Sequence, residues 1–538
     1  MTRGLKYLPV NIMHPCLRVD EIIRLVAYEL VDSGAEGTAA SLARCCKSFG
    51  EPVSDELWDA QERLTPLLKC LPEDTWKDSG KFVSRPITFS PSAVIHQTWK
   101  TFKRTPTKVE WAGFRKYALK MRNLQLDASE DPEISDLLLV QRSHATNDPW
   151  LPRLRFFRCD RVTEQLIPLI PFFLSPRTTG ISIGFNERTP TAVVGPIITR
   201  LPTLCPDMSQ ISLDPLPSNP VITGAVSGML LACRKDQLRA FLVNSPLIEE
   251  AREVVCQLPK LSRLHTVIKG DTRMPPVRLP NLATIWIMID DCLDWLEGFR
   301  GANLAKLETV RLFSGSEGIG DLLGAFGRVA VTTSAQHSLS TLVFYTPHPW
   351  YPNYQSLLPF TQLQELSIEF SCDGICSAAV DDDEFVELVR AMPKLKILEL
   401  GGPPCNVYTG ITGKGLLALA HNCWDLWRLR IHFRVDCFAE AVEIQKTLSY
   451  FRDRTAWKRV HALTDLEVGM TPIWDWAKGT MVAEGMLELF PRLWNIKSVV
   501  LPWAKIQQDI RSFQLTSELD HQTSKACLQP FSSIAVAD

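Results

Sequence analysis

One motif recurs along this chain, and its clearest copy is residues 411–431, I-T-G-K-G-L-L-A-L-A-H-N-C-W-D-L-W-R-L-R-I. The copy begins with an amphipathic helical stretch, continues through Cys423, and ends with Leu426, Leu429 and Ile431 in the spacing L-x-x-L-x-L. A single unit of this kind cannot bury its own apolar face, so it needs neighbours of the same kind. The motif therefore predicts a stack of repeats.

Further copies of the spacing are present in the rest of the chain. The copies that begin at Leu363, Leu395 and Leu426 are separated by 32 and 31 residues, which is within the range of helix-plus-strand repeats. Two more regular copies are Leu307/Val310/Leu312 and Leu339/Leu342/Phe344, and Leu463/Leu466/Val468 follows. Weaker copies are Met121/Leu124/Leu126, Leu154/Phe157, Met208/Ile211/Leu213, Leu238/Phe241/Val243, Leu261/Leu264, Leu282/Ile285/Ile287 and Leu493/Ile496.

This pattern is typical of leucine-rich repeats. We predict an α/β solenoid over residues 121–503, with parallel strands on its concave face and helices on its convex face. Such a solenoid can be long because each repeat contacts only its neighbours.

The composition argues against several classes of protein. The formal net charge is -2, whereas a dedicated nucleic-acid binder normally carries a basic excess. No apolar run approaches the roughly 18 residues that span a bilayer, and the N-terminus lacks a secretory signal. The 15 cysteines include no C-x-x-C pair, so we expect reduced thiols in the cytoplasm and/or the nucleus. We expect no nucleic-acid or membrane partner, no metal and no cofactor.

The segments at the two ends differ from the repeats. In residues 14–62, apolar residues form helical clusters separated by glycine-containing turns, which predicts a bundle of three short helices. A bundle this small needs to be covered by a partner or by the solenoid. We expect a helical linker and N-terminal cap over residues 63–120, and a polar tail over residues 504–538.

The bundle resembles an F-box. The resemblance rests on H-P-C-L-R-V-D-E-I-I-R-L-V, S-L-A-R-C-C-K-S-F and D-E-L-W, with Cys16-Leu17 in place of the usual Leu-Pro. An F-box followed by leucine-rich repeats is the domain order of F-box/leucine-rich-repeat proteins, and residues 110–124 resemble the linker helix of fungal members. The positions that correspond to the adaptor-binding motif are Leu17, Glu21, Ile22, Ile23, Leu42, Leu57 and Trp58.

The resemblance implies a function without chemistry of its own. F-box proteins are substrate receptors of cullin-RING ubiquitin ligases, in which the F-box binds a Skp-type adaptor, and through it a cullin, while the repeats hold a target protein. Two other classes stay open. One is a leucine-rich-repeat scaffold whose N-terminal helices are an end cap, and the other is an enzyme that uses the repeats as a platform.

Motifs that carry catalytic chemistry have simpler structural interpretations here. Residues 381–384, D-D-D-E, stand directly before a helix, where carboxylates stabilise the first turn, so we expect them to cap it. The ten histidines include no H-E-x-x-H, and the glycines of residues 315–320 lack the Lys-Ser/Thr of a P-loop. We assign no catalytic residue.

Alternation along the strands predicts which side chains face the concave surface. The predicted target-binding residues on this surface are Trp286, Arg311, Phe313, Tyr345, Glu369, Glu399, Arg428, Arg430, His432 and Glu467. Aromatic residues and arginine dominate the energy of protein interfaces. The column formed by Glu399, Arg430 and Glu467 equally fits a structural ladder of ion pairs.

Two loops rich in proline and aromatic residues follow predicted strands and extend the candidate surface. They carry Trp350 and Tyr351 in one loop, and Trp474 and Trp476 in the other. Such loops are good recognition elements when a rigid scaffold holds them. They equally fit a role in shielding the edge of the solenoid.

Overall fold

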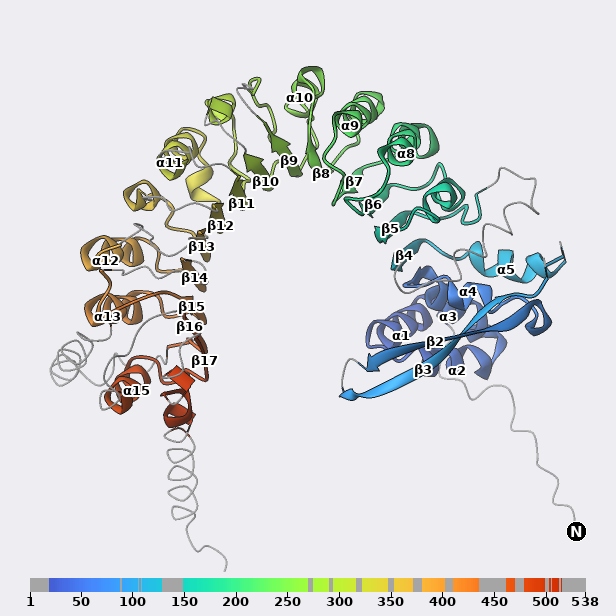
Figure 1. The fold of residues 1–538 in the computed structure, drawn as a ribbon, viewed down its shortest axis with the longest axis horizontal. Coiled ribbons are helices and arrows are strands. Elements are labelled where there is room, and N and C mark those ends of the chain that lie inside the picture. The colour runs from blue at the N-terminus through green and yellow to red at the C-terminus, as the bar shows by residue number, and fades with distance from the viewer. Residues whose placement is uncertain are drawn as a thin grey trace, which may run out of the picture. The chain divides into compact units, whose positions relative to one another are not determined.

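The computed structural model divides into two compact units, Met1–Val254 and Val255–Asp538. The residues that the structure describes are 19–87, 90–104, 106–107, 109–127, 149–269, 274–289, 294–315, 322–346, 353–370, 380–401, 410–434, 461–469, 479–498, 503–504, 506–511 and 514. Within each unit, helical segments alternate with short strands that lie side by side in parallel, and the first unit also contains an antiparallel hairpin (Figure 1).

Three helices open the first unit: α1 (Asp20–Asp32), α2 (Glu36–Cys45) and α3 (Lys47–Asp59). Gly34, at a φ of 74°, turns the chain between α1 and α2, a backbone conformation that favours glycine. Their shared core contains Ile23, Ala27, Phe49 and Val53, all buried. The bundle predicted from the sequence thus has a closed apolar core of its own.

The remaining elements of the first unit begin with β1 (Ala60–Gln61), α4 (Thr65–Leu68) and the 3-10 turn η2 (Glu73–Thr75). Then follow β2 (Trp76–Ile87), β3 (Ser90–Phe102), α5 (Glu110–Ala118), β4 (Asn123–Asp127), β5 (Phe156–Val162), η3 (Ile167–Leu169), α7 (Ile170–Phe173), β6 (Gly180–Phe185), α8 (Thr191–Leu204), β7 (Gln210–Leu213), α9 (Pro220–Ala232), β8 (Ala240–Pro246) and α10 (Glu249–Val255).

The segment 63–120 differs from the helical linker that we expected. Strands β2 and β3 form an antiparallel hairpin, and the rings of Trp76 and Phe102 stack at its base with centroids 4.4 Å apart. Residues 92–102, S-A-V-I-H-Q-T-W-K-T-F, are rich in β-branched and aromatic types, which favour strands. Only α4 and α5 of this segment are α-helices in the part that the structure describes.

The second unit contains β9 (Arg263–Ile268), β10 (Thr284–Ile289), η4 (Asp294–Phe299), β11 (Thr309–Ser314), α11 (Leu322–Thr332), η5 (Ala335–His337), β12 (Thr341–Thr346), η6 (Tyr354–Leu357) and β13 (Glu365–Phe370). It continues with α12 (Asp382–Ala391), β14 (Ile397–Leu400), α13 (Gly413–Asn422), β15 (Arg428–Arg430), β16 (Asp465–Gly469), α15 (Gly479–Leu489) and β17 (Asn495–Ser498). Every neighbouring pair from β9 to β17 is parallel.

The leucine spacing sets the register of this sheet. Leu366 pairs with Leu398, Leu398 with Leu429, and Leu429 with Leu466, and all four side chains are buried. Because alternate residues of a strand face opposite ways, the residues between these leucines face the concave side. The leucine-rich-repeat solenoid is confirmed, with strands on the concave face and helices on the convex face of each unit (Figure 1).

The C-terminal segment departs from the polar tail that we expected from residue 504 onward. Trp503, Ile506 and Ile510 are buried, and the ring of Trp503 packs edge-on against Phe433. The side-chain amide of Gln514 donates to the main-chain oxygen of Leu493, at 2.8 Å. Among the described residues, Trp503 therefore packs on the segment after β15, and Gln514 contacts the segment before β17.

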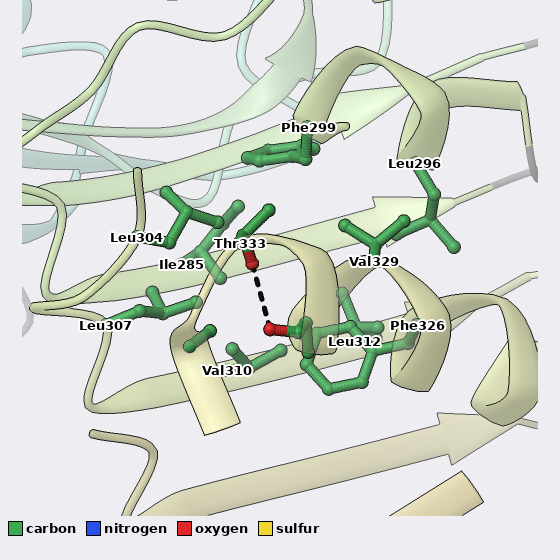
Figure 2. Close-up of a pocket in the computed structure, with 12 residues that line it drawn as sticks. Ile285, Leu296, Phe299, Leu304, Leu307, Val310, Leu312, Phe326, Val329 and Thr333 are labelled. Carbon is green, nitrogen blue, oxygen red and sulfur yellow. Dashed lines mark hydrogen bonds between the residues drawn. The ribbon is translucent and has the colours of Figure 1, made fainter. Parts of the chain in front are cut away.

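A small cavity of about 20 Å³ lies inside the second unit, between β10, β11 and α11 (Figure 2). Its lining is apolar apart from Thr333, whose hydroxyl donates to the main-chain oxygen of Ala330. Val310 lines it at a register where β10 carries Ile285 and β12 carries Leu342. Valine is shorter than the isoleucine and leucine at the equivalent positions of the neighbouring strands, and the cavity lies beside it. A cavity of this size holds about one water molecule and is too small for a ligand.

Candidate interaction surfaces

The N-terminal bundle is joined to the first repeat of its unit through α3. The indole of Trp58 stacks on Tyr117 of α5, with ring centroids 4.6 Å apart. The carboxylate of Asp55 forms ion pairs with Lys120 at 2.7 Å and with Arg24 of α1 at 2.8 Å. Although burial of Asp55 works against its charged form, these two cations hold its pKa below the ordinary value.

The junction extends the sheet itself. Strand β1 pairs with β4 in parallel, and the amide side chain of Asn123 donates to the carboxylate of Asp59 at 3.0 Å. The main-chain N–H of Arg122 donates to the main-chain oxygen of Asp59. These contacts place β1 on the edge of β4, an edge that would otherwise lack a neighbouring strand in this sheet.

The predicted adaptor-binding residues divide into three groups in the structure. Ile23 is buried in the bundle core, while Leu42 and Leu57 pack against that core and are partly buried. Trp58 is held in the junction with α5. Only Glu21 is exposed and Ile22 half-exposed on α1, and Leu17 lies outside the described residues.

An apolar stripe at the start of α1 consists of Val19, the residue before the helix, with Ile22, Leu25 and Val26, of which only Ile22 was among the predicted adaptor-binding residues. Leu25 is 63% exposed and Val26 is 43% exposed, whereas Ile23 and Ala27, which belong to the bundle core, are buried. The four positions follow the helical spacing i, i+3, i+6 and i+7, so they share one side of the helix. The signal was present in the sequence, because D-E-I-I-R-L-V-A-Y has apolar residues on both sides of a helix.

The second candidate surface is the concave face of the second unit, where β9 to β12 carry aromatic rings in contact with one another. The imidazole of His265 stacks on Trp286 at 4.4 Å, Trp286 lies 5.3 Å from Phe313, and Phe313 lies 5.8 Å from Tyr345. The guanidinium of Arg311 lies 5.7 Å from the ring centroid of Trp286, close enough for a cation–π contact. We call His265, Trp286, Phe313 and Tyr345 the aromatic ladder.

Burial changes the protonation of the innermost member of the aromatic ladder. His265 is buried, and this burial lowers its pKa to about 4. Its imidazole is therefore neutral at physiological pH. Sequence reasoning did not select His265, because an isolated histidine in a weak repeat copy carries no local signal.

The adjoining strands β13 to β16 carry a cluster of ion pairs centred on Arg430. Its guanidinium lies 3.0 Å from Glu369, 3.5 Å from Glu399 and 3.2 Å from Glu467. Arg428 forms a further pair with Glu399 at 3.0 Å, and the hydroxyl of Ser367 donates to Glu399. The interpretation of Glu399, Arg430 and Glu467 as a column of structural ion pairs is confirmed.

The charges in this cluster stabilise one another. Burial opposes the charged form of Arg430, but the carboxylates of Glu399, Glu467 and Glu369 outweigh it and raise the pKa of the guanidinium. Glu399 is only 7% exposed, and His432 is also buried, with its pKa lowered by that burial. The prediction that Glu399 and His432 are accessible to a target is therefore wrong for the free protein.

The remaining predicted residues have simpler outcomes. Asp381 caps α12 as expected, because its carboxylate accepts the main-chain N–H of Glu384. Asp382 has a different role, because it accepts the main-chain N–H of Thr412 at the start of α13. Trp350, Tyr351, Trp474 and Trp476 lie outside the described residues, so the two loops stay predictions.

The described residues contain no group of three or more His, Cys, Asp or Glu side chains placed to hold a metal ion. In the same part of the chain, no helix is both long enough and apolar enough to cross a membrane.

No family model and no curated protein matches the sequence. Among solved structures, the fold is similar to a chain in the crystal structure of the Rad7 and Elc1 complex in yeast, with 14% sequence identity and a TM-score of 0.37. The similarity covers 73% of this chain and 91% of that chain.

Proposed function

We propose that this chain is the substrate-recognition subunit of a Skp-cullin-F-box ubiquitin ligase. Its N-terminal bundle binds a Skp-type adaptor, and through it a cullin, while its repeats bind a target protein. The chain itself is not an enzyme, needs no cofactor, and acts in the cytoplasm and/or the nucleus.

The observation that carries this proposal is the exposed apolar stripe of α1. Within the described residues, the bundle core does not include Leu25 and Val26, and both side chains are exposed. Exposed apolar side chains that share one helix side are typical of a surface that a protein partner covers. The stripe lies within the segment that resembles an F-box, and it includes Ile22 of the adaptor motif.

The rigid junction also supports a receptor role. The Asp55 ion pairs, the Trp58–Tyr117 stack and the β1–β4 pairing hold the bundle in one place on its own unit. These contacts would hold an adaptor bound to the bundle in a fixed position relative to the first repeat of the same unit.

The same junction favours a second candidate function. A bundle that covers the first strand fits a leucine-rich-repeat scaffold in which the helices serve only as an end cap. The two functions differ in what they require of the stripe. A pure cap has no need of Leu25 and Val26, whereas an adaptor-binding module does.

Co-migration of the purified full-length chain with a Skp-type adaptor and a cullin, measured by size-exclusion chromatography, tests the proposal. We expect a ternary complex with the wild type and none with Leu25→Asp, because the interface would then bury an unpaired charge. The matched control is Val221→Asp on α9, another exposed aliphatic residue of the same unit. If the wild type forms no complex, the scaffold function is favoured. If Leu25→Asp and Val221→Asp both leave the complex intact, the stripe is not the docking surface.

A further inference from the structure

The concave face of the second unit carries a row of four side chains, in which three apolar or aromatic residues are followed by a carboxylate. Met288, Phe313, Tyr345 and Glu369 occupy equivalent register positions on β10, β11, β12 and β13. Met288 is 36% exposed and Tyr345 is 37% exposed, so the apolar part of the row is accessible at both of its ends. The row thus begins with apolar surface and ends with a carboxylate.

The carboxylate end belongs to a region with an excess of negative charge. The concave positions of β13 to β16 carry five carboxylates (Glu365, Glu369, Glu399, Asp465 and Glu467) and two guanidinium groups (Arg428 and Arg430), a net charge of three negative. Arg430 is already shared among three carboxylates. The surface is therefore electrostatically complementary to a cationic side chain.

Glu369 is the carboxylate best placed to receive that cation. Its side chain is partly exposed, and its contacts with Arg430 and Ser367 both fall on Oε1. Within the described residues, Oε2 is left for another donor. A lysine or arginine of a partner can pair with Oε2 without displacing Arg430.

The dimensions of the row match an extended chain. Adjacent strands lie about 4.8 Å apart, so the distance from Met288 to Glu369 is about 14 Å, which equals four residues of extended polypeptide at about 3.4 Å each. The neighbouring concave column holds the half-buried Trp286, Arg311 and Val343 and the buried Ser367. The two exposed apolar side chains at the concave positions of β10 to β12, Met288 and Tyr345, both belong to the row.

From this surface, and resting on the proposed receptor function, we infer that the target carries an extended segment with alternating apolar residues and a lysine or arginine at one end. Two apolar side chains, two residues apart, lie over Met288, Phe313 and Tyr345. The basic side chain, four residues from the first of them, pairs with Glu369. Alternation is required because only every second side chain of an extended segment faces the row.

Selection from a phage-displayed library of random linear heptapeptides on the immobilised full-length chain tests this inference. We expect enriched peptides to contain a lysine or arginine four residues from one of two alternating apolar residues. Tyr345→Ser and Glu369→Gln should each lower the affinity of a synthetic copy of the most enriched peptide roughly tenfold. Met288→Ser should do the same, and it removes no ion pair.

The matched controls are Trp427→Ser, an exposed aromatic outside the row, and Glu387→Gln on the convex helix α12. Both should bind the same peptide within about twofold of wild type. Recovery of acidic peptides, recovery of no enriched peptide, or equal binding by the row variants and the controls overturns the inference. Adaptor binding is measured on the same preparations. Loss of adaptor binding with intact peptide selection contradicts the ligase role and leaves the recognition surface standing.

Discussion

Arg430 of β15 reaches across β14 to place its guanidinium 3.0 Å from the carboxylate of Glu369 in β13. The same group also contacts Glu399 between them and Glu467 on the far side. One side chain therefore ties together four consecutive strands of the concave face. Arg430 therefore has a structural role in the free protein, apart from any contact that it makes with a target.

Replacement of Arg430 by glutamine should destabilise the second unit. The change leaves three carboxylates close together with only Arg428 to offset them, so we expect a cost of about 2–3 kcal/mol, less than for a fully buried pair because the side chain is partly exposed. Urea unfolding monitored by fluorescence measures the loss. Arg390→Gln on the exposed side of α12 is the control, with a change below about 0.5 kcal/mol. Equal unfolding midpoints for the two variants would contradict a structural role for Arg430.

Enlarging Val310 to isoleucine should stabilise the second unit. The added methylene enters the cavity shown in Figure 2, and burial of one methylene contributes about 0.8 kcal/mol. The control is Val468→Ile. Val468 of β16 is fully buried but does not line this cavity, so the larger side chain should be neutral or destabilising through overpacking. Thermal unfolding of both variants distinguishes them. A lower melting temperature for Val310→Ile would show that the cavity cannot accept the extra methylene.

Replacement of Trp58 by alanine should loosen the bundle. The stack on Tyr117 is lost, which removes about 0.5–1.5 kcal/mol beyond the buried area. Hydrogen exchange of α3 amides should become faster, whereas Tyr28→Ala, at an exposed aromatic of α1, should change it little. Identical exchange in both variants would mean that the stack does not hold the junction.

The stability of the second unit should fall as the pH drops from about 6.5 to about 4. Nδ1 of His461 accepts the main-chain N–H of Leu463 at 3.1 Å, so this imidazole has to be neutral, and burial lowers its pKa to about 4. Since the unfolded pKa is about 6.5, the stabilisation is complete above that pH and lost below about 4, at most about 3 kcal/mol. His265 should contribute in the same direction.

Urea midpoints measured across this pH range test that expectation. His461→Asn keeps an acceptor for the Leu463 N–H and should flatten the pH profile, whereas His337→Asn, at an exposed position, should not. A wild-type profile that His461→Asn leaves unchanged would show that His461 does not titrate on unfolding.

The repeats could be predicted from the sequence because the leucine spacing is a local signal. One strand of the first unit, β6, was missed, since Thr178 stands where its neighbours have leucine or methionine. The structure explains this exception: Thr178 is fully buried, and its hydroxyl donates to the main-chain oxygen of Leu154 at 3.1 Å. A polar residue can occupy a core position when its hydrogen bond is satisfied, and apolar periodicity cannot detect that.

The candidate sites were less predictable because they depend on tertiary contacts. Whether Trp58 faces a partner or the junction is decided by Tyr117, which lies far along the chain. Likewise, Glu399 stands at a concave position but is covered by Arg428 and Arg430. Alternation predicts the side on which a residue lies, and its accessibility depends on neighbours from other repeats.

Binding of a Skp-type adaptor to the full-length chain, measured by titration calorimetry, tests the central claim most directly. The account expects saturable binding at one adaptor per chain, weakened at least tenfold by Leu25→Ala through loss of an exposed apolar contact, and unchanged by Val221→Ala. Absence of binding to the wild type, or equal affinities for the two variants, would contradict it.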